Sequence, residues 1–340
     1  KSSGFSLDLG WWNGITGADV DQDGDIDYVV TNLGNNSRYH GDSLHPNVIY
    51  YGDVDGSGVS RIVEAKFEGE ICYPERGKSC STAAIPSLAG KFKSFEGFAL
   101  ASLNDIYPNQ KLNQALRLEV NRLESVLLRN DRGQFRVEPL PVLSQISPGF
   151  GLAAGDFNSD GTMDLVMAQN DFSPQPETGR MDGGMGLLLN WKSEEHIEAV
   201  WPRESGISVA GDGTAAVVVD LNQDAWPDLL IAQNNGPLKF FANQRIGEGP
   251  KPLVLRLIGP SGNSDGIGAR VSVTCGEAKP MVQEVYGGSG YLGQSTARLF
   301  FSLRTESAEV IVDVIWPDGL QSQMRLRDSR EDLVSIRYPR

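Results

Sequence analysis

Short apolar runs separated by turn-forming residues occupy most of the chain. Runs of strand length occur at ITGA (15–18), YVVTNLGNN (28–36), LVMAQNDF (165–172) and LLIAQNNG (229–236). Their content of Val, Leu and Ile and their short length predict buried β-strands. The 39 glycines and 18 prolines among 340 residues also favour a β-rich fold over a helical one.

A nine-residue polar stretch recurs between pairs of these runs. In chain order, loops one to four read DVDQDGDID (19–27), DVDGSGVSR (53–61), DFNSDGTMD (156–164) and DLNQDAWPD (220–228). Loop two is the weakest copy. A further apolar strand completes the unit, as in VLLRNDRGQF, LLLNWKS and LKFFANQ at 126–135, 187–193 and 238–244. A strand–loop–strand unit that repeats in this way predicts the blades of a β-propeller.

The region between loops two and three interrupts the repeat. Its first part, CYPERGKSCSTAAIPSLAGKFKSFEGF, is irregular, and a later stretch has apolar side chains at helical spacing: Leu112, Leu116, Val120, Leu123 and Leu127. We therefore predict an irregular, partly helical insertion at 70–122, after which the chain returns to strand near 124–130.

The composition changes again from position 245. RIGEGPKP (245–252) has the glycines and prolines of a linker, and beyond it short strand patterns are separated by GPSGNSDG, GGSG and WPDG turns. We predict two domains, a propeller at 1–248 and a compact all-β module at 251–340.

The net charge of −14 is concentrated in the four loops. They hold 13 of the 44 acidic residues, without which the formal charge would be −1. An acidic chain lacks the basic face that nucleic-acid binding needs, so we expect no nucleic-acid partner. No apolar run approaches the 18 residues of a membrane span, and the N-terminus has no signal-peptide core. The chain therefore starts like a mature, trimmed or partial protein.

The spacing of the loops suits a hard divalent cation such as Ca²⁺, which takes six to eight oxygen ligands. Side chains at places one, three, five and nine and the carbonyl at place seven would point inward, and glycine at place six would allow the bend. In loop one the expected ligands are Asp19, Asp21, Asp23, Asp25 (carbonyl) and Asp27, and in loop two they are Asp53, Asp55, Ser57 and Val59 (carbonyl). In loop three they are Asp156, Asn158, Asp160, Thr162 (carbonyl) and Asp164. In loop four they are Asp220, Asn222, Asp224, Trp226 (carbonyl) and Asp228. We predict three to four calcium sites.

Two departures from the pattern concern loops two and four. Ala225 stands at place six of loop four, where a positive φ would strain it. Arg61 stands at place nine of loop two, where a cation could replace a metal. Place twelve is Val30, Met167 or Ile231, inside an apolar run, so these loops are not EF-hands, which need a glutamate there. Asp and Gly are also common in plain turns, but three matched copies favour metal binding.

The loop motif D-x-[DN]-x-D-G-x-x-D between apolar strands resembles the FG-GAP, or VCBS, repeat of integrin α-subunit heads and secreted bacterial proteins. Three C-terminal stretches resemble the ASPIC and UnbV domain: GNSDGIGARVSV (262–273), EVYGGSGYLGQS (284–295) and VDVIWPDG (312–319). This pairing is seen in cartilage proteins and in numerous bacterial surface or secreted proteins. The resemblance implies an all-β chain, with a β-propeller that is commonly seven-bladed and carries calcium in several blade loops. It also implies a secreted, cell-surface or periplasmic location.

The chain has three cysteines. Cys72 and Cys80 flank the stretch YPERGKS and could form a local disulfide in an exported protein, two unpaired thiols being the other interpretation. Cys275 follows a strand pattern and is expected in the core.

No catalytic motif stands out. The sequence has no G-x-S-x-G elbow, phosphate-binding loop or dinucleotide fingerprint. We therefore expect a calcium-stabilised, non-catalytic binding or adhesion module for a protein or glycan. The alternative is a carbohydrate-active enzyme on a propeller scaffold with structural calcium, favoured by the many carboxylates and by the insertion at 70–122. A third hypothesis is a structural part of a larger adhesin.

Overall fold

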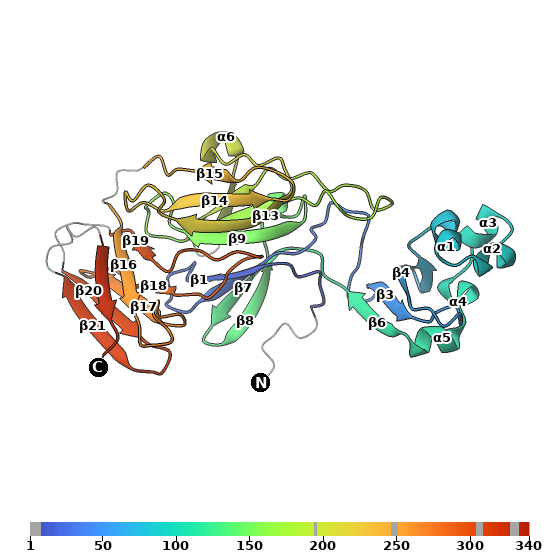
Figure 1. The fold of residues 1–340 in the computed structure, drawn as a ribbon, viewed down its shortest axis with the longest axis horizontal. Coiled ribbons are helices and arrows are strands. Elements are labelled where there is room, and N and C mark those ends of the chain that lie inside the picture. Colours follow the sequence, from blue (N-terminus) through green and yellow to red (C-terminus); the bar gives the residue numbers. More distant parts are fainter. Residues whose placement is uncertain (1–7, 194–195, 246–250, 304–308, 327–332, 340) are drawn as a thin grey trace. The chain divides into compact units, whose positions relative to one another are not determined.

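The computed structural model describes residues 8–193, 196–245, 251–303, 309–326 and 333–339. Strands dominate and helices are few and short, which confirms the all-β prediction (Figure 1). The chain divides into two compact units. Unit 1 contains Trp12–Asn36 and the chain from Glu124 onward, and unit 2 contains Ser37–Leu123 with a short N-terminal segment.

Three antiparallel sheets of unit 1 share one plan, in which a polar nine-residue loop joins the first strand to the second. The first sheet has the order β1-β2-β7-β8, the second β9-β10-β11-β12 and the third β13-β14-β15. The first two sheets comprise β1 (Ile15–Ala18), β2 (Asp27–Val30), β7 (Val126–Asp131) and β8 (Gln134–Pro139), and β9 (Gly149–Gly155), β10 (Asp164–Gln169), β11 (Leu187–Ser193) and β12 (His196–Val200). The third comprises β13 (Gly213–Val219), β14 (Asp228–Gln233) and β15 (Lys239–Phe241). The predicted strand–loop–strand repeat is thus confirmed for loops one, three and four.

The three sheets pack on one another through their apolar faces. One core joins Val29 and Leu127 of the first sheet to Leu189 of the second. Another joins Val166 of the second sheet to Ile231 of the third. This packing is what propeller blades need, while a closed ring and its number of blades remain predictions.

The first strands of the three sheets lie next to one another, with β9 between β1 and β13. The approach is close, because a Cβ added to Gly151 would lie 2.5 Å from the backbone nitrogen of Ala216. Glycine at this position allows the two strands to touch through their backbones.

The C-terminal module contains two sheets around its own core. The first has the order β19-β16-β22, with β16 and β22 parallel, and the second has the order β18-β17-β20-β21. The strands are β16 (Leu253–Ile258), β17 (Arg270–Cys275), β18 (Met281–Glu284), β19 (Leu299–Phe301), β20 (Val310–Ile315), β21 (Gln321–Leu326) and β22 (Leu333–Arg337). Trp316, Phe301 and the buried Cys275 belong to the core. Most of the predicted linker at 245–252 lies outside the described residues.

This module packs on the other sheets of unit 1. Its Val254 and Phe300 join the apolar core of the second and third sheets. The segment between β18 and β19 reaches β1 and β13, the first strands of the first and third sheets. The amide of Gly290 donates to the carbonyl of Ile15 (2.7 Å), and the amide of Thr296 donates to the carbonyl of Val218 (3.0 Å).

Unit 2 is inserted between β2 and β7 and is larger than the predicted 70–122. It has one sheet of order β5-β4-β3-β6, covered on one side by short helices. Its elements are β3 (Asn47–Gly52), β4 (Arg61–Glu68), β5 (Ile71–Pro74), α1 (Lys78–Ala84), α2 (Ser87–Lys91), α3 (Phe95–Ala99), α4 (Leu103–Ile106), α5 (Asn109–Gln114) and β6 (Leu116–Val120). Loop two joins β3 to β4 and therefore lies in this unit.

The expected helix is only partly present in unit 2. Helix α5 begins after Pro108 and ends at Gln114, and the following residues form β6, which pairs with β3. The helical interpretation was wrong for Leu116–Val120, because strand pairing outweighs a spacing that a short apolar run can show by chance. The predicted return to strand near 124–130 is confirmed by β7 (Val126–Asp131). Two short elements complete the fold, a 3-10 turn at Val142–Ser144 and α6 (Pro202–Ser205).

Candidate metal centre

All four loops have a left-handed backbone at the same two places. Place six has a positive φ in each, as expected for a sharp bend, and place four has one as well. From loop one to loop four, the φ values at place four are 58° (Gln22), 80° (Gly56), 59° (Ser159) and 62° (Gln223). At place six they are 94° (Gly24), 80° (Gly58), 85° (Gly161) and 72° (Ala225). Ala225 therefore has the strained conformation that the sequence predicted. Place four was missed, since Gln and Ser give no signal for a left-handed backbone.

Repeated hydrogen bonds hold the loop side chains inward. Asp25 N donates to Asp23 Oδ1 (2.8 Å), and places five and seven of loops three and four have the same contact. Place nine closes the loop, since the amide of Val20 donates to Asp27 Oδ2 (3.2 Å), again with equivalents in loops three and four. Loop two has Arg61 at place nine and lacks this closure, and the amide of Val54 donates to Gly52 O instead.

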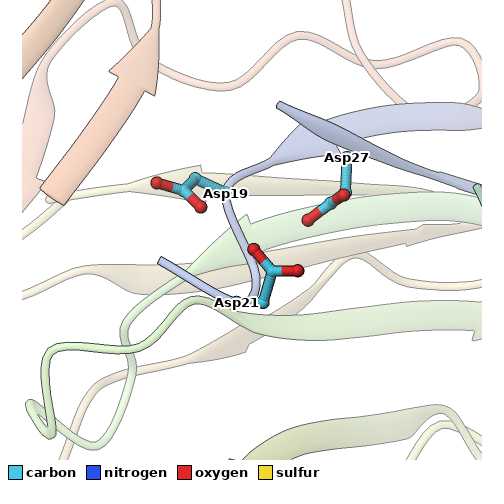
Figure 2. Close-up of side chains that lie close together, drawn as sticks. All are labelled: Asp19, Asp21 and Asp27. Carbon is cyan, nitrogen blue, oxygen red and sulfur yellow. The ribbon is translucent and has the colours of Figure 1, made fainter. Parts of the chain in front are cut away.

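Loop one brings three carboxylates together. Ligand atoms of Asp19, Asp21 and Asp27 all lie within 4.8 Å of one another (Figure 2). Asp19 is only 3% exposed, and neither of its carboxylate oxygens has a hydrogen-bond partner of ordinary geometry, although the nearby backbone amide of Gly24 acts to lower its pKa. A buried carboxylate without partners is costly, and a bound cation is a usual remedy.

The electrostatics of loop one favour a bound cation. Burial raises the pKa of Asp19 from 3.8 to about 7, and repulsion by Asp21, Asp23 and Asp27 adds to the effect. Burial also raises the pKa of Asp27 to about 6. The hydrogen bond from the backbone amide of Asn130 acts in the opposite direction, because it favours the charged form. The ionised form of these carboxylates is therefore destabilised by burial and mutual repulsion. A bound divalent cation would stabilise it.

Two contacts from β7 and the turn after it fix loop one from outside. Arg129 Nη1 lies 2.6 Å from Asp21 Oδ2, and its Nε lies 3.1 Å from Glu138 Oε1. The amide of Arg132 donates to Asp25 Oδ2 (3.0 Å). The Asp21 side chain is therefore held in place by the sheet, which favours a preformed site.

Loop three also fits a metal. Asp156 and Asp164 are 4% and 1% exposed, and Asp164 Oδ1 has no hydrogen-bond partner. Burial raises the pKa of Asp156 to about 6, and it raises the pKa of Asp164 well above its usual range. Asn158 and Asp160 complete the set of side-chain oxygens, linked by a hydrogen bond of 3.0 Å.

In loop four, cationic side chains of the protein meet the aspartates. Arg245 Nη2 contacts Asp224 Oδ2, and Arg298 Nη1 lies 3.9 Å from Asp220 Oδ2. Both oxygens of Asp220 accept backbone amides, from Asp224 (3.0 Å) and Ala225 (3.2 Å), as those of Asp156 do in loop three. The two arginines therefore distinguish loop four, and they compensate much of its negative charge.

Loop two is likewise paired with cations. Lys111 Nζ lies 2.9 Å from Asp53 Oδ2, and Arg61 Nε lies 3.9 Å from Asp55 Oδ2. Ser57 Oγ donates to Asp55 Oδ1 (2.7 Å). The hydrogen bond from Lys111 is the main reason that the pKa of Asp53 is lowered. Arg61 approaches this loop as the sequence suggested, but Lys111 was not foreseen, because it lies 58 residues away in α5.

The candidate disulfide between Cys72 in β5 and Cys80 in α1 is not formed, and the structure agrees with the other interpretation, two thiols. Cys72 packs against the apolar core of unit 2, and burial raises its pKa to about 11, which keeps it protonated.

Comparison with known proteins identifies the C-terminal module. Residues 259–336 match the family model described as ASPIC and UnbV. This module is an ASPIC and UnbV domain. The antiparallel pairing of β17 with β20 and the segment that reaches Ile15 both fall within the matched residues.

The rest of the chain is also similar to known proteins. Mouse cartilage acidic protein 1 is 24% identical over 271 residues, which is 77% of this chain and 40% of that protein. Its human counterpart is 23% identical over 222 residues, or 65% of this chain and 33% of that protein. Human integrin alpha-7 is 33% identical over 141 residues, or 37% of this chain and 11% of the integrin. These matches confirm the resemblance inferred from the motifs, and the chain spans 40% or less of each relative.

Among the residues that the structure describes, no helix combines the length and the apolar character that a membrane span requires.

Proposed function

We propose that the chain is a calcium-stabilised, non-catalytic module that works outside the cell and binds a protein or a glycan. The observation that carries the calcium part is Asp19, a buried aspartate whose two oxygens lack hydrogen-bond partners beside Asp21 and Asp27. We place calcium in loops one and three, because Asp19 and Asp164 there have buried carboxylate oxygens without hydrogen-bond partners, even though Arg129 pairs with Asp21 in loop one. In loops two and four, cationic side chains meet the aspartates.

Calcium would act on the junctions between strands. Asp19 follows β1 and Asp27 begins β2, so an ion held by both ties the two strands of the first sheet together. The same holds for Asp156 and Asp164 between β9 and β10. An ion that binds only the folded state at a concentration of 100 times Kd adds about 2.7 kcal/mol of stability.

The binding role is supported by the relatives and by the construction of the chain. An integrin α-subunit and a cartilage protein both belong outside the cell, and the ASPIC and UnbV domain is matched at the C-terminus. Rigid sheets with ordered loops provide a scaffold for recognition, and binding residues are often placed on such loops. A protein ligand is the choice that the integrin similarity favours.

Thermal melting with and without a calcium chelator tests the calcium part. We expect the chelated chain to melt at a clearly lower temperature and millimolar calcium, but not magnesium, to restore it, because Mg²⁺ demands a smaller octahedral site. An unchanged melting curve would refute the proposal. For the binding part, the calcium-loaded chain would be applied to glycan and matrix-protein arrays. Cleavage of a bound glycan would instead establish the enzyme alternative.

A further inference from the structure

Loops one and three touch each other through a single side chain. Gln22, at place four of loop one, donates from Nε2 to the carbonyl oxygen of Gly161 at 2.7 Å. Gly161 is place six of loop three, where that loop bends, and it lies 139 residues further along the chain. The Gln22 side chain is half-buried at this contact. The two candidate calcium loops, which belong to different sheets, are therefore joined directly.

The contact falls on the peptide unit that orients a predicted ligand of loop three. The carbonyl of Gly161 and the amide of Thr162 belong to the same planar peptide. That amide donates to Asp160 Oδ1 at 2.8 Å, and Asp160 is the predicted ligand at place five. Holding the carbonyl side of this peptide fixes its amide side as well. Gln22 of loop one thus supports the position of the Asp160 carboxylate in loop three, as outer contacts of metal ligands commonly do.

Loop four has the same backbone at place four but lacks such a contact. Gln223 has a φ of 62°, close to the 58° of Gln22. Among the residues that the structure describes, the side chain of Gln223 has no hydrogen-bond partner. A glutamine at place four therefore does not by itself create a link between loops, and the chain contains a matched control for Gln22.

The charges of loops one and three act mainly within each loop. Burial raises the pKa of Asp19, and the charges that add most to this effect are three aspartates of its own loop. Burial also raises the pKa of Asp164, and the charges that add most are Asp156 and Asp160 of the same loop. The hydrogen bond from Gln22, rather than a charge interaction, is therefore the main connection between the two loops.

We propose that Gln22 is a positioning residue for the ion of loop three and couples the two loops, so that calcium in loop one strengthens calcium binding in loop three. This inference rests on the proposed calcium sites. An ion in loop one offsets the repulsion among its carboxylates and so stabilises the loop conformation that carries Gln22. Gln22 then holds the Gly161–Thr162 peptide in the orientation that places Asp160. Because coupling between two binding sites is reciprocal, an ion in loop three strengthens binding in loop one to the same extent.

Calorimetric titration of the chelator-stripped full chain with calcium tests the coupling. Gln22→Met keeps the length of the side chain but removes the donor. We expect a Hill coefficient above one for the wild type and a lower one for Gln22→Met, with roughly two- to tenfold weaker binding, the range for one hydrogen bond. Gln223→Met makes the same change at place four of loop four and should titrate like the wild type. In chelator, both variants should melt at the same temperature, whereas a contact that only stabilises the fold would lower the melting temperature of Gln22→Met.

A second background separates coupling from a local effect. Asp21→Ala disables loop one, and we expect it to weaken binding in loop three as well, although Asp21 lies outside that loop. Adding Gln22→Met to Asp21→Ala should then change the remaining affinity little, because coupled residues are not additive.

The outcomes also separate this proposal from the calcium proposal. A Gln22→Met titration that coincides with that of the wild type, or a wild-type Hill coefficient of one, overturns the coupling and leaves the calcium sites standing. A wild type that binds no calcium overturns both. If Gln22→Met does not fold, Gln22→Ala is titrated against Gln223→Ala and judged by the same criterion.

Discussion

The backbone amide of Leu221 donates a hydrogen bond of 3.1 Å to Oδ2 of Asp228, across the whole of loop four. The other oxygen, Oδ1, accepts the amide of Asn243 at 2.9 Å. Asp27 in loop one has the same two contacts, with Val20 and Asn130. The carboxylate of the last aspartate in these loops therefore closes the loop by accepting backbone amides. This role is separate from any contact with a metal.

Asp228→Ala should destabilise the chain with and without calcium. The change leaves two partly buried amides without acceptors, which costs about 2–4 kcal/mol for two such groups. Urea denaturation in calcium and in chelator would measure it, and Asp228→Asn, which keeps one acceptor oxygen, should lose less. A loss that appears only in calcium would contradict the closing role.

Asp21→Ala should remove calcium stabilisation, whereas Asp25→Asn should be nearly silent. The Asp21 carboxylate belongs to the cluster of three in loop one, while Asp25 is expected to supply its carbonyl, and its carboxylate accepts only the amide of Arg132 among the contacts described. An asparagine can still accept that amide. The measurement is the increase in melting temperature on adding calcium, and equal losses in both variants would refute this assignment of ligands.

Ala225→Gly should stabilise the chain by about 0.5–1 kcal/mol, since the left-handed backbone is costly for residues other than glycine. Ala225 has a φ of 72° at place six. The reverse change, Gly24→Ala in loop one, is the control, because an added Cβ there meets no atom within 4 Å and reports backbone strain alone. It should destabilise by a similar amount. If both variants have the wild-type stability, place six is not strained.

Without calcium, the chain should become less stable as the pH rises from about 4 to 7. The pKa values of Asp19 and Asp27 are about 7 and 6 in the folded state and near 3.8 otherwise. The folded state therefore binds more protons in this range, and the stability contributed by the protonated groups is lost as the pH passes through the folded-state values. Melting of the chelated protein across this range checks it, and Asp19→Asn should flatten the slope.

Calcium should reverse this trend, since it favours the charged carboxylates. The gain in melting temperature on adding calcium is expected to grow from pH 5 to pH 8. A gain that stays constant over this range would show that the raised pKa values of loop one do not belong to calcium ligands.

Gly17→Ala should weaken the packing of the ASPIC and UnbV domain on the first sheet. A Cβ at Gly17 would lie 2.4 Å from the hydroxyl oxygen of Tyr286, and overpacking of this kind typically costs about 1–3 kcal/mol. Tyr286→Phe removes that oxygen and should recover part of the loss in the double variant. The control is Gly77→Ala, where an added Cβ meets nothing within 4 Å. Additive effects of the two substitutions would exclude the clash.

The repeating elements can be predicted from the amino-acid sequence alone. The strand patterns at 15–18, 28–36, 165–172 and 229–236 and the loops beside them are local, because turn residues and alternating oxygens act over a few residues. Place six of loop four was likewise predictable, since Ala225 stands where its three counterparts are glycine. The β module at the C-terminus was also recognisable, from its short strands and turns.

Which charged side chains meet depends on the folded structure. Lys111 and Asp53 are 58 residues apart, and Arg298 reaches Asp220 from another module, so no local pattern reveals either pair. The residues of β6 have helical spacing in the sequence but form a strand, because they pair with β3, which is distant in the chain. The contact of Gln22 with the carbonyl of Gly161, 139 residues away, has the same origin. Coulomb and packing energies depend on distance in space, and the fold alone sets that distance.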